Sequence, residues 1–370
     1  MLLLCVPGAH AQSKVTVNPD QTISLDGSKF FPIGVYLQSD WSGVKKLGAD
    51  MASRPFCVNT DALQSAAKKH LYLHYTAGPG CDDDNAAAIK KRNASPFTSS
   101  VNEAKGNDYL FGYGLPDEPV SSEDLSPADT KWAYGVIKAA DPNHPVFFTD
   151  YASDIGAHKD SADIFLNDEY PFNNDARPLY DIKTKLVKMQ GQVAPKPAWL
   201  IIQTGSQFGM PTNAQIRAES YLSIALGSTG LIFYSYDIKD QGGVHNIKKD
   251  GDRTYMTALI SELKDFSPYF LGTKDSSLSY SSSDVDAILK DADGKSYLVA
   301  VNKNDAARNI TFTLNGFGGA KATIIGHADA GSTRTGQTLT LASSGALADS
   351  LQGLEAVVYE ITKKKAAGRE

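Results

Sequence analysis

The feature that most constrains this chain is a regular alternation of short apolar runs with helical stretches over its first two thirds. Apolar runs of strand length recur eight times. They cover residues 30–37, 49–56, 71–76, 108–115, 146–149, 164–167, 199–203 and 230–234. Eight strand–helix units in roughly 240 residues are typical of an α/β fold of the (β/α)8 or TIM barrel type. A doubly wound open sheet fits less well, because the Gly-rich phosphate turn that usually follows its first strand is absent.

Further segments flank the predicted barrel. Residues 14–31 alternate around turn signals such as Asp26-Gly27, which predicts a β-hairpin, and we assign residues 14–270 to the barrel domain with this hairpin. The sequence pattern then changes to short segments of alternating polar and apolar residues, which predicts a small antiparallel β-sandwich over residues 275–362. Residues 363–370 form a polar tail. We expect the sandwich to pack on the barrel and stabilise it.

The first residues have features of an export signal. Met1 to Pro7 is apolar, and Ala9-His10-Ala11 is an A-x-A cleavage site, although a positive n-region is missing. We therefore expect residues 1–11 to be a signal peptide and the protein to be secreted, into the medium or the periplasm. No other segment approaches the ~20 apolar residues that would cross a bilayer.

The sequence contains three cysteines. Cys5 leaves with the signal, and Cys57 and Cys81 follow two successive predicted strands, so we expect them to form a disulfide. Two unpaired thiols are the alternative. The spacings C-x-x-C and H-x-x-x-H are absent, so we expect no metal site and no cofactor.

The charge balance limits the possible partners. The net charge is −6, which gives no electrostatic case for binding nucleic acid or an anionic membrane. The 17 tyrosines and 15 phenylalanines suit carbohydrate, because sugars stack on rings and hydrogen-bond to hydroxyls. No protein partner is implied.

The most informative stretch is residues 108–119, DYLFGYGLPDEP. An aromatic strand ends in two prolines that place Asp117 and Glu118 at its C-terminal end, where barrels carry catalytic groups. Burial beside a second carboxylate raises the pKa of a carboxyl towards the range of a general acid. The alternative is structural, with Asp117 as a helix cap and Glu118 as a solvated acid.

The other strand ends add a set of acidic and aromatic groups without lysine or arginine. The full set is Tyr36, His74, Tyr75, Asp117, Glu118, Asp150, Asp168, Glu169, Tyr170, Gln203, Tyr236 and Asp237. This composition argues against phosphate substrates and against catalytic zinc. It fits cleavage of a glycosidic bond, which needs two carboxyls and aromatic platforms. A G-x-S-x-G elbow is absent and histidines are few, which argues against an esterase.

Four motifs resemble those of clan-A-type glycoside hydrolases, which combine a (β/α)8 barrel with a C-terminal β-sandwich. They are ISLDGSKFFPIGVY, GYGLPDEP, ADIFLNDEYPF and AESYLSIALGSTGLIFYSY. The resemblance implies that Glu118 is the general acid and points to Asp168 at the sixth strand. The sequence departs from the family at two positions. Asp117 replaces the usual Asn, and Gln203 stands where the seventh strand usually carries a nucleophilic Glu.

We therefore predict a glycoside hydrolase that cleaves an oligo- or polysaccharide, with Glu118 as general acid and Asp168 as second carboxylate. A non-catalytic glycan-binding barrel is the alternative, favoured by Gln203. Further predictions concern neighbouring residues. His74 is expected in the core, and residues 82–84 in a solvated loop. The predicted substrate-binding residues, for most of which barrel packing is an equal alternative, are Asp117, Tyr36, Tyr75, Tyr170, Gln203 and Tyr236.

Overall fold

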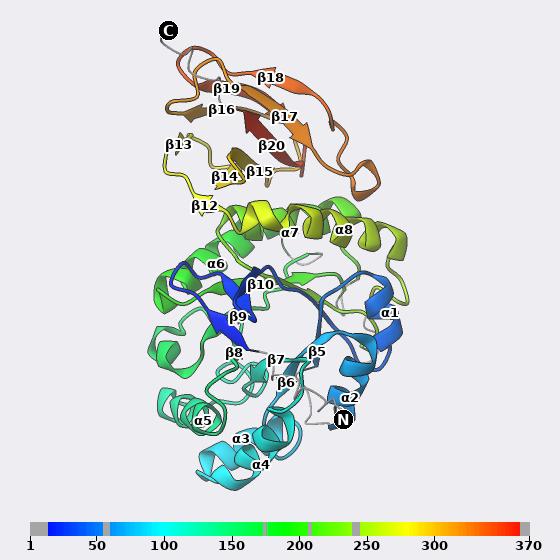
Figure 1. The fold of residues 1–370 in the computed structure, drawn as a ribbon, viewed down its shortest axis with the longest axis vertical. Coiled ribbons are helices and arrows are strands. Elements are labelled where there is room, and N and C mark those ends of the chain that lie inside the picture. The colour runs from blue at the N-terminus through cyan, green and yellow to red at the C-terminus, as the bar shows by residue number, and fades with distance from the viewer. Residues whose placement is uncertain are drawn as a thin grey trace, which may run out of the picture.

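The computed structural model describes residues 14–54, 60–172, 175, 177–205, 209–238 and 245–362. Within these ranges, eight parallel strands close into a barrel in the order β10-β11-β4-β5-β6-β7-β8-β9, which confirms the predicted fold (Figure 1). The barrel strands are β4 (Ile33–Tyr36), β5 (Met51–Arg54), β6 (Tyr72–Thr76), β7 (Leu110–Gly114), β8 (Val146–Thr149), β9 (Ile164–Asn167), β10 (Ala198–Gln203) and β11 (Leu231–Tyr234).

Helices surround the barrel and connect its strands. They are α1 (Trp41–Lys46), α2 (Thr60–Lys69), α3 (Asp82–Lys90), α4 (Ala94–Ala104), α5 (Pro127–Ala140), α6 (Pro178–Val193), α7 (Asn213–Ala225) and α8 (Arg253–Phe270). A short 3-10 helix, η1 (Gly156–Ser161), connects β8 to β9. Among the described helices, none has the length and apolar character that crossing a membrane requires.

Side chains of the barrel strands alternate between two layers, as the period of two in a strand dictates. In β10, Leu200 and Ile202 belong to the core between strands and helices. Trp199 and Ile201 belong to the core inside the barrel, together with Phe111 and Phe147. The interior is therefore a packed core, and groups for chemistry are confined to the ends of the strands.

A small antiparallel sheet covers the N-terminal end of the barrel. It has three strands, β1 (Val15–Val17), β2 (Ile23–Leu25) and β3 (Ser28–Phe30), where the sequence predicted a two-stranded hairpin. The prediction placed Phe30 in the strand of residues 30–37, but Phe30 ends β3, and Phe31 and Pro32 separate it from β4. Val15 and Ile23 join the interior core, so this sheet closes the end opposite to the strand ends that carry polar groups.

The C-terminal residues form two packed antiparallel sheets, which confirms the predicted sandwich. One sheet has the order β12-β14-β15-β20-β17-β18 and the other β13-β16-β19. The strands are β12 (Thr273–Lys274), β13 (Leu278–Ser279), β14 (Val285–Ala292), β15 (Lys295–Asn302), β16 (Arg308–Leu314), β17 (Lys321–Ile325), β18 (Thr338–Thr340), β19 (Ala346–Leu351) and β20 (Ala356–Thr362). The short element η2 (Ala328–Ala330) follows β17.

Helices α7 and α8 lie between the barrel and the sandwich, directly below the sandwich in Figure 1. Residues 216–225 of α7 are buried without interruption, because one face packs on the barrel and the other on the sandwich. Arg217 of α7 donates from Nη1 to Glu262 Oε1 of α8 at 2.5 Å and to the carbonyl of Ala330 at 2.9 Å. The backbone N–H of His327 donates to the other carboxylate oxygen of Glu262. Buried polar groups therefore connect the two domains.

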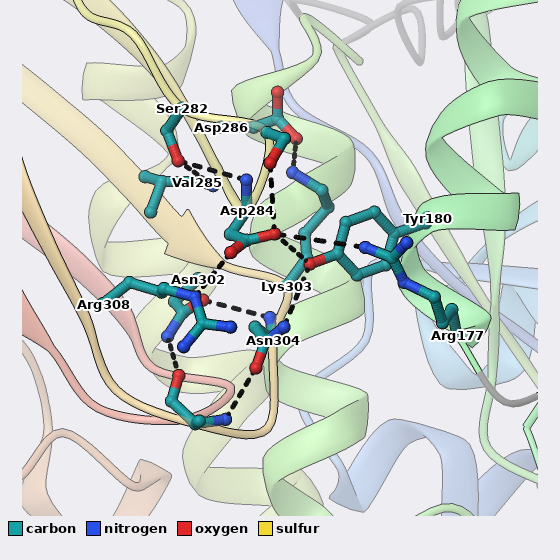
Figure 2. Close-up of polar contacts among 12 residues, drawn as sticks. Arg177, Tyr180, Ser282, Asp284, Val285, Asp286, Asn302, Lys303, Asn304 and Arg308 are labelled. Atoms are coloured by element: carbon teal, nitrogen blue, oxygen red, sulfur yellow. Dashed lines mark hydrogen bonds and ion pairs between the residues drawn. The ribbon is translucent and has the colours of Figure 1, made fainter.

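A second polar cluster connects the sandwich to α6 (Figure 2). Asp284 accepts hydrogen bonds from the hydroxyl of Tyr180 and from Arg308 Nε, each at 2.5 Å. Asp286 accepts from Lys183 of α6 at 2.6 Å and also pairs with Lys303. The sandwich is thus held against the barrel at two places.

Candidate active site

The loop after β7 places Asp117 and Glu118 at the carboxyl end of the barrel. The backbone N–H of Asp117 donates to Asp82 Oδ1 at 3.0 Å. Its side-chain Oδ1 is buried and has no hydrogen-bond partner among the described residues. Glu118 has a φ of 45°, in the left-handed region, and its carboxylate accepts from the hydroxyl of Ser122. The two adjacent carboxyls therefore have different surroundings.

Asp150, at the end of β8, holds this loop in place. It is fully buried, and its Oδ2 accepts from the backbone N–H groups of Val120 and Ser121 at 2.7 and 3.2 Å. Its Oδ1 accepts from the hydroxyl of Ser121 and from the N–H of Ala152. A carboxylate with this many donors is a structural clamp for the segment that follows Glu118.

Asp168 follows β9 and has the opposite character. Only 6% of its surface is exposed, yet its Oδ1 has no hydrogen-bond partner within the described part of the chain. Burial raises its pKa well above the usual range, and the carboxylates of Asp117, Glu118 and Asp150 raise it further. Asp168 therefore lies within electrostatic range of the carboxylates on the loop after β7.

The pKa of Asp117 is raised for the same reasons as that of Asp168. Burial raises its pKa well above the usual range, with further contributions from Asp82, Glu118 and Asp150. The charged groups that act most strongly on Asp117 and Asp168 are thus other carboxylates. Two buried carboxyls without a cation between them favour states in which a proton is retained. This is the condition that a general acid needs at neutral pH.

Three tyrosines line the same end of the barrel. Tyr170 stacks on Tyr234, with ring centroids 5.0 Å apart and planes inclined by 18°. Tyr36 meets Tyr234 edge to face at 5.5 Å. Burial raises the pKa of Tyr36 well above its usual range, and Asp117 and Asp168 raise it further. The predicted residues Tyr36 and Tyr170 therefore lie beside the carboxyls, and their contact with a substrate stays a prediction.

Gln203 ends β10 and is fully buried. Its Oε1 accepts from the N–H of Phe172 at 2.9 Å, and its Nε2 donates to the carbonyl of Phe172 at 3.4 Å. Its own backbone N–H donates to Glu219 Oε2 at 3.1 Å. The amide thus holds the loop that carries Asp168 and Tyr170, and the prediction that it binds substrate stays untested.

Tyr75 and Tyr236 pack in the core outside the barrel strands, and their contact with a substrate stays a prediction. Tyr75 belongs to the core between strands and helices, and its hydroxyl lies 3.2 Å from that of Ser100 in α4. Tyr236 belongs to the same core and packs against Gly43 of α1, where a Cβ would lie 2.2 Å from its hydroxyl. The prediction used strand ends alone, and near each strand end alternate side chains point outward.

Two other strand-end residues are structural. Asp237 is buried and accepts from the backbone N–H groups of Gln38, Ser39 and Asp40, which ties the start of the β4 loop to the end of β11. His74 is buried in the barrel interior, as expected, with Nδ1 2.9 Å from the hydroxyl of Ser53. Burial lowers the pKa of His74 to about 3, so it is neutral.

Two residues near the candidate site were not predicted from the sequence. Asp82 was expected in a solvated loop, but it is the first residue of α3 and is mostly buried against the loop of Asp117. Burial raises its pKa to about 7, helped by Glu123, Asp83 and Glu118. Tyr234 ends the predicted strand 230–234 but was left out of the set of strand-end groups, although its position two residues after Ile232 of the barrel interior gives it the same inward face. The alternation signal could have identified Tyr234, whereas nothing in a run of three aspartates marks the first as buried.

Only one of the two cysteines of the predicted disulfide lies within the described residues. Cys81 is disulfide-bonded. Cys57 lies outside the described residues, so the pairing of Cys57 with Cys81 stays a prediction. Across the described ranges, no group of three or more His, Cys, Asp or Glu side chains is arranged to hold a metal ion.

Comparisons with known proteins agree on the fold. No protein-family model matches the chain, and no curated protein matches its sequence. Among solved structures, the α-amylase GTA from Geobacillus thermoleovorans matches with a TM-score of 0.61 at 10% identity, over 90% of this chain and 99% of that one. Amy13B of Eubacterium rectale matches with a TM-score of 0.58 at 7% identity, over 89% and 95%.

A third match is a GH30 endoxylanase from Clostridium papyrosolvens, with a TM-score of 0.51 at 14% identity, over 90% of this chain and 96% of that one. The alignments with these enzymes cover nearly the whole of both chains. The chain therefore has the fold of glycoside hydrolases that combine a parallel barrel with an antiparallel β-domain, as the resemblance of its motifs implied.

Proposed function

We propose that this protein is a glycoside hydrolase that cleaves O-glycosidic bonds of an oligo- or polysaccharide with two carboxyls. The observation that carries the proposal is that the buried carboxyl of Asp168 lies within electrostatic range of Asp117 and Glu118 at the carboxyl end of the barrel. Asp168 is almost fully buried and has an unpartnered oxygen within the described residues. The buried carboxyls of Asp150 and Asp237, in contrast, accept hydrogen bonds from backbone N–H groups.

The surroundings of these carboxyls suit a neutral sugar. Tyr36, Tyr170 and Tyr234 supply aromatic surface and hydroxyl groups beside them. Rings of this kind stack on the apolar faces of sugars, and their hydroxyls bond to sugar hydroxyls. An anionic substrate would meet repulsion from Asp117, Asp168 and Glu118.

The two carboxyls divide the chemistry as glycosidases require. One member of the Asp117–Glu118 pair donates a proton to the leaving oxygen. The motif assigns this role to Glu118, whereas the buried surroundings and raised pKa favour Asp117. Asp168 activates a water molecule or attacks the anomeric carbon. Gln203 leaves the seventh strand without a nucleophile, which makes Asp168 the second carboxyl in this proposal.

The test is a screen of the purified protein against polysaccharides and aryl glycosides. Cleavage of at least one substrate is the expected result, and NMR of the first-formed anomer then distinguishes inversion from retention. Binding of glycans without any cleavage would contradict the proposal and favour a carbohydrate-binding barrel. Added EDTA should leave the activity unchanged, because two carboxyls suffice for the reaction.

We also propose that the protein is exported. The proposal rests on the apolar residues Met1 to Pro7 and the cleavage site at Ala9 to Ala11, all outside the described ranges. N-terminal sequencing of the protein recovered from the medium or periplasm tests it, with Gln12 as the expected first residue.

A further inference from the structure

We propose that Gln203 is a positioning residue for Asp168, and that its amide at the end of the seventh strand is required for activity. The inference rests on the proposed function, since it assigns Asp168 a role in the reaction. It replaces the simpler view that Gln203 marks a lost nucleophile.

The first step of the argument is the geometry of the amide. Gln203 Oε1 accepts from the N–H of Phe172 at 2.9 Å, and Nε2 donates to the carbonyl of the same residue at 3.4 Å. Both Gln203 and Phe172 are fully buried. The amide therefore satisfies both the backbone N–H and the backbone carbonyl of Phe172. A charged glutamate side chain, which has the same length, accepts hydrogen bonds but cannot donate one.

The second step is the path from Phe172 to Asp168. The two residues lie four positions apart on the segment that leaves β9, with Tyr170 between them. Tyr170 is fixed by its stack on Tyr234 at 5.0 Å, and Phe172 by Gln203. The segment after Asp168 is thus anchored at two of its next four residues, while Asp168 Oδ1 has no partner among the described residues. Asp168 is oriented by the anchored segment.

The third step concerns Gln203 itself. Its backbone N–H donates to Glu219 Oε2 of α7 at 3.1 Å, so the end of β10 is fixed from the helix side as well. Glu219 is fully buried, and burial raises its pKa well above the usual range. The end of the seventh strand is therefore a supporting element, and the carboxyl it contacts lies on the helix side, away from Asp168.

The chemistry of the amide gives a discriminating variant, Gln203→Glu. A carboxylate accepts hydrogen bonds but donates none, so it leaves the carbonyl of Phe172 unpaired and buries a charge. A protonated carboxyl accepts with one oxygen and donates with the other, as the amide does. The positioning role therefore predicts that Q203E loses activity at neutral pH and regains it on acidification.

The first measurement is the pH profile of kcat and KM for wild type, Q203E and Gln203→Leu. At pH 7 to 8 we expect kcat of both variants to fall on the order of 10²-fold, as for a displaced reacting group, with KM little changed. Below the pKa of the buried carboxyl, Q203E should approach the wild type while Q203L stays low. The inference is overturned if Q203E is more active than wild type at neutral pH and cleaves with retention, because a glutamate at position 203 would then act as the nucleophile.

The second measurement needs no substrate. The pKa of Asp168 is followed by carbon-13 NMR of labelled aspartate, with the signal assigned by its loss in Asp168→Asn. We expect a pKa well above 4 in wild type, since burial raises it, and a value closer to 4 in Q203L, because a released segment admits water. If Q203L does not fold, the same titration is made with Gln203→Met, which has a similar length and no hydrogen-bonding amide.

Asn302 of β15 provides a matched control. It is fully buried, and its amide also bonds backbone groups in both directions, donating to the carbonyl of Ala306 at 2.9 Å and accepting from the N–H of Asn304. Asn302→Leu should lower stability but leave the pKa of Asp168 and the shape of the pH profile unchanged. An unchanged pKa of Asp168 in both Gln203 variants would overturn the positioning role.

The two proposals fail in different ways. If the wild type cleaves no glycoside, the proposed function is contradicted, and the NMR titration still decides whether Gln203 positions Asp168. If the wild type is active and Q203L retains its kcat and its Asp168 pKa, the function stands and the positioning role falls.

Discussion

Buried carboxyls among the described residues differ in their partners. Glu262 is fully buried, but it pairs with Arg217 and accepts from Tyr221. Asp286 has two lysines. Asp117 and Asp168 are raised in pKa chiefly by burial and by other carboxylates. Leaving buried acids without a cation costs stability, and such costs concentrate at functional sites.

The proton donor can be identified from its dependence on the leaving group. We expect Asp117→Asn to lose activity on the order of 10²–10⁴-fold on glycosides with poor leaving groups and far less on dinitrophenyl glycosides, whose leaving group needs no proton. The reason is that burial and the neighbouring carboxylates of Asp82, Glu118 and Asp150 favour a proton on Asp117. Hydrolysis rates of an aryl glycoside series test this. The same pattern in Glu118→Gln alone would assign the role to Glu118, as the motif predicts.

Asp82 should make the stability depend on pH. Its pKa is raised to about 7 when folded, against about 4 for an unfolded chain, so between these values the folded state holds a proton that the unfolded state has lost. Its stabilising effect is therefore complete below pH 4 and is lost as the pH rises through 7. Asp82→Asn keeps the acceptor for Asp117 but removes the titration. Urea unfolding should show the variant gaining about 1–3 kcal/mol relative to wild type between pH 4 and 8, whereas parallel profiles would contradict the argument.

At the scale of single residues, the sequence predicted which kinds of side chain lie at the strand ends better than the direction in which each side chain points. Asp117, Asp168, Tyr36 and Tyr170 were predicted from strand ends, and the structure brings them together. Tyr75 and Asp237 come from the same kind of position, but a one-residue shift in the strand period turns a side chain outward or into a backbone clamp. Which residue ends on which side depends on register, and register is set by tertiary pairing.

The loop after β7 is an element under local strain. Glu118 adopts a φ of 45°, which costs a residue with a Cβ on the order of 1 kcal/mol. The strain is maintained by contacts on either side, because Asp82 holds the N–H of Asp117 and Asp150 holds those of Val120 and Ser121. The loop therefore has the properties of a segment shaped for placement of its carboxyls.

This strain predicts a reversal of the usual order of glycine and alanine. We expect Glu118→Gly to be more stable than Glu118→Ala by about 0.5–1 kcal/mol, because only glycine accepts this backbone conformation without cost. In an ordinary strand or helix the order is the opposite. Chemical denaturation of the two variants measures the difference, and an alanine variant of equal or greater stability would show that the loop is relaxed.

At the scale of elements, the apolar barrel strands were predicted more accurately than the strands of the sandwich. The strands β6, β8, β9 and β10 match the predicted ranges closely, because each is a short apolar run bounded by turn residues. The strand β19 has weak local propensity, because its sequence ALADSL carries an aspartate and a serine, and it owes its conformation to pairing with β16. Pairing with a neighbour compensated for weak local propensity there.

The whole molecule is a barrel whose last two helices are covered by the sandwich. This arrangement explains why α7 is buried on both sides, and why its polar residues Arg217 and Glu219 are inside the protein. The architecture was predictable from the change of texture near residue 270. The connection between the domains was not, because the residues that make it lie more than 40 positions apart in sequence.

The buried contact of Glu262 should be critical for the whole fold. In the wild type, one oxygen of Glu262 accepts from Arg217 and Tyr221, and the other accepts from the backbone N–H of His327. Glu262→Gln replaces one of these oxygens with an NH2 group, so at least one of the donors then faces another donor. We expect a loss of about 3–5 kcal/mol in the free energy of unfolding, typical of breaking a buried pair. Glu360, which pairs with the exposed Lys295, is the control, and Glu360→Gln should cost less than about 1 kcal/mol. Equal effects in guanidinium denaturation would contradict a special role for the buried contact.

The most direct test of the account compares wild type with Asp168→Asn in the release of reducing ends from a panel of polysaccharides. We predict that the wild type cleaves at least one of them and that Asp168→Asn, folded as judged by circular dichroism, loses activity on the order of 10²–10⁴-fold. A variant as active as the wild type would contradict the assignment of Asp168. A wild type that binds glycans but cleaves none would contradict the hydrolase itself.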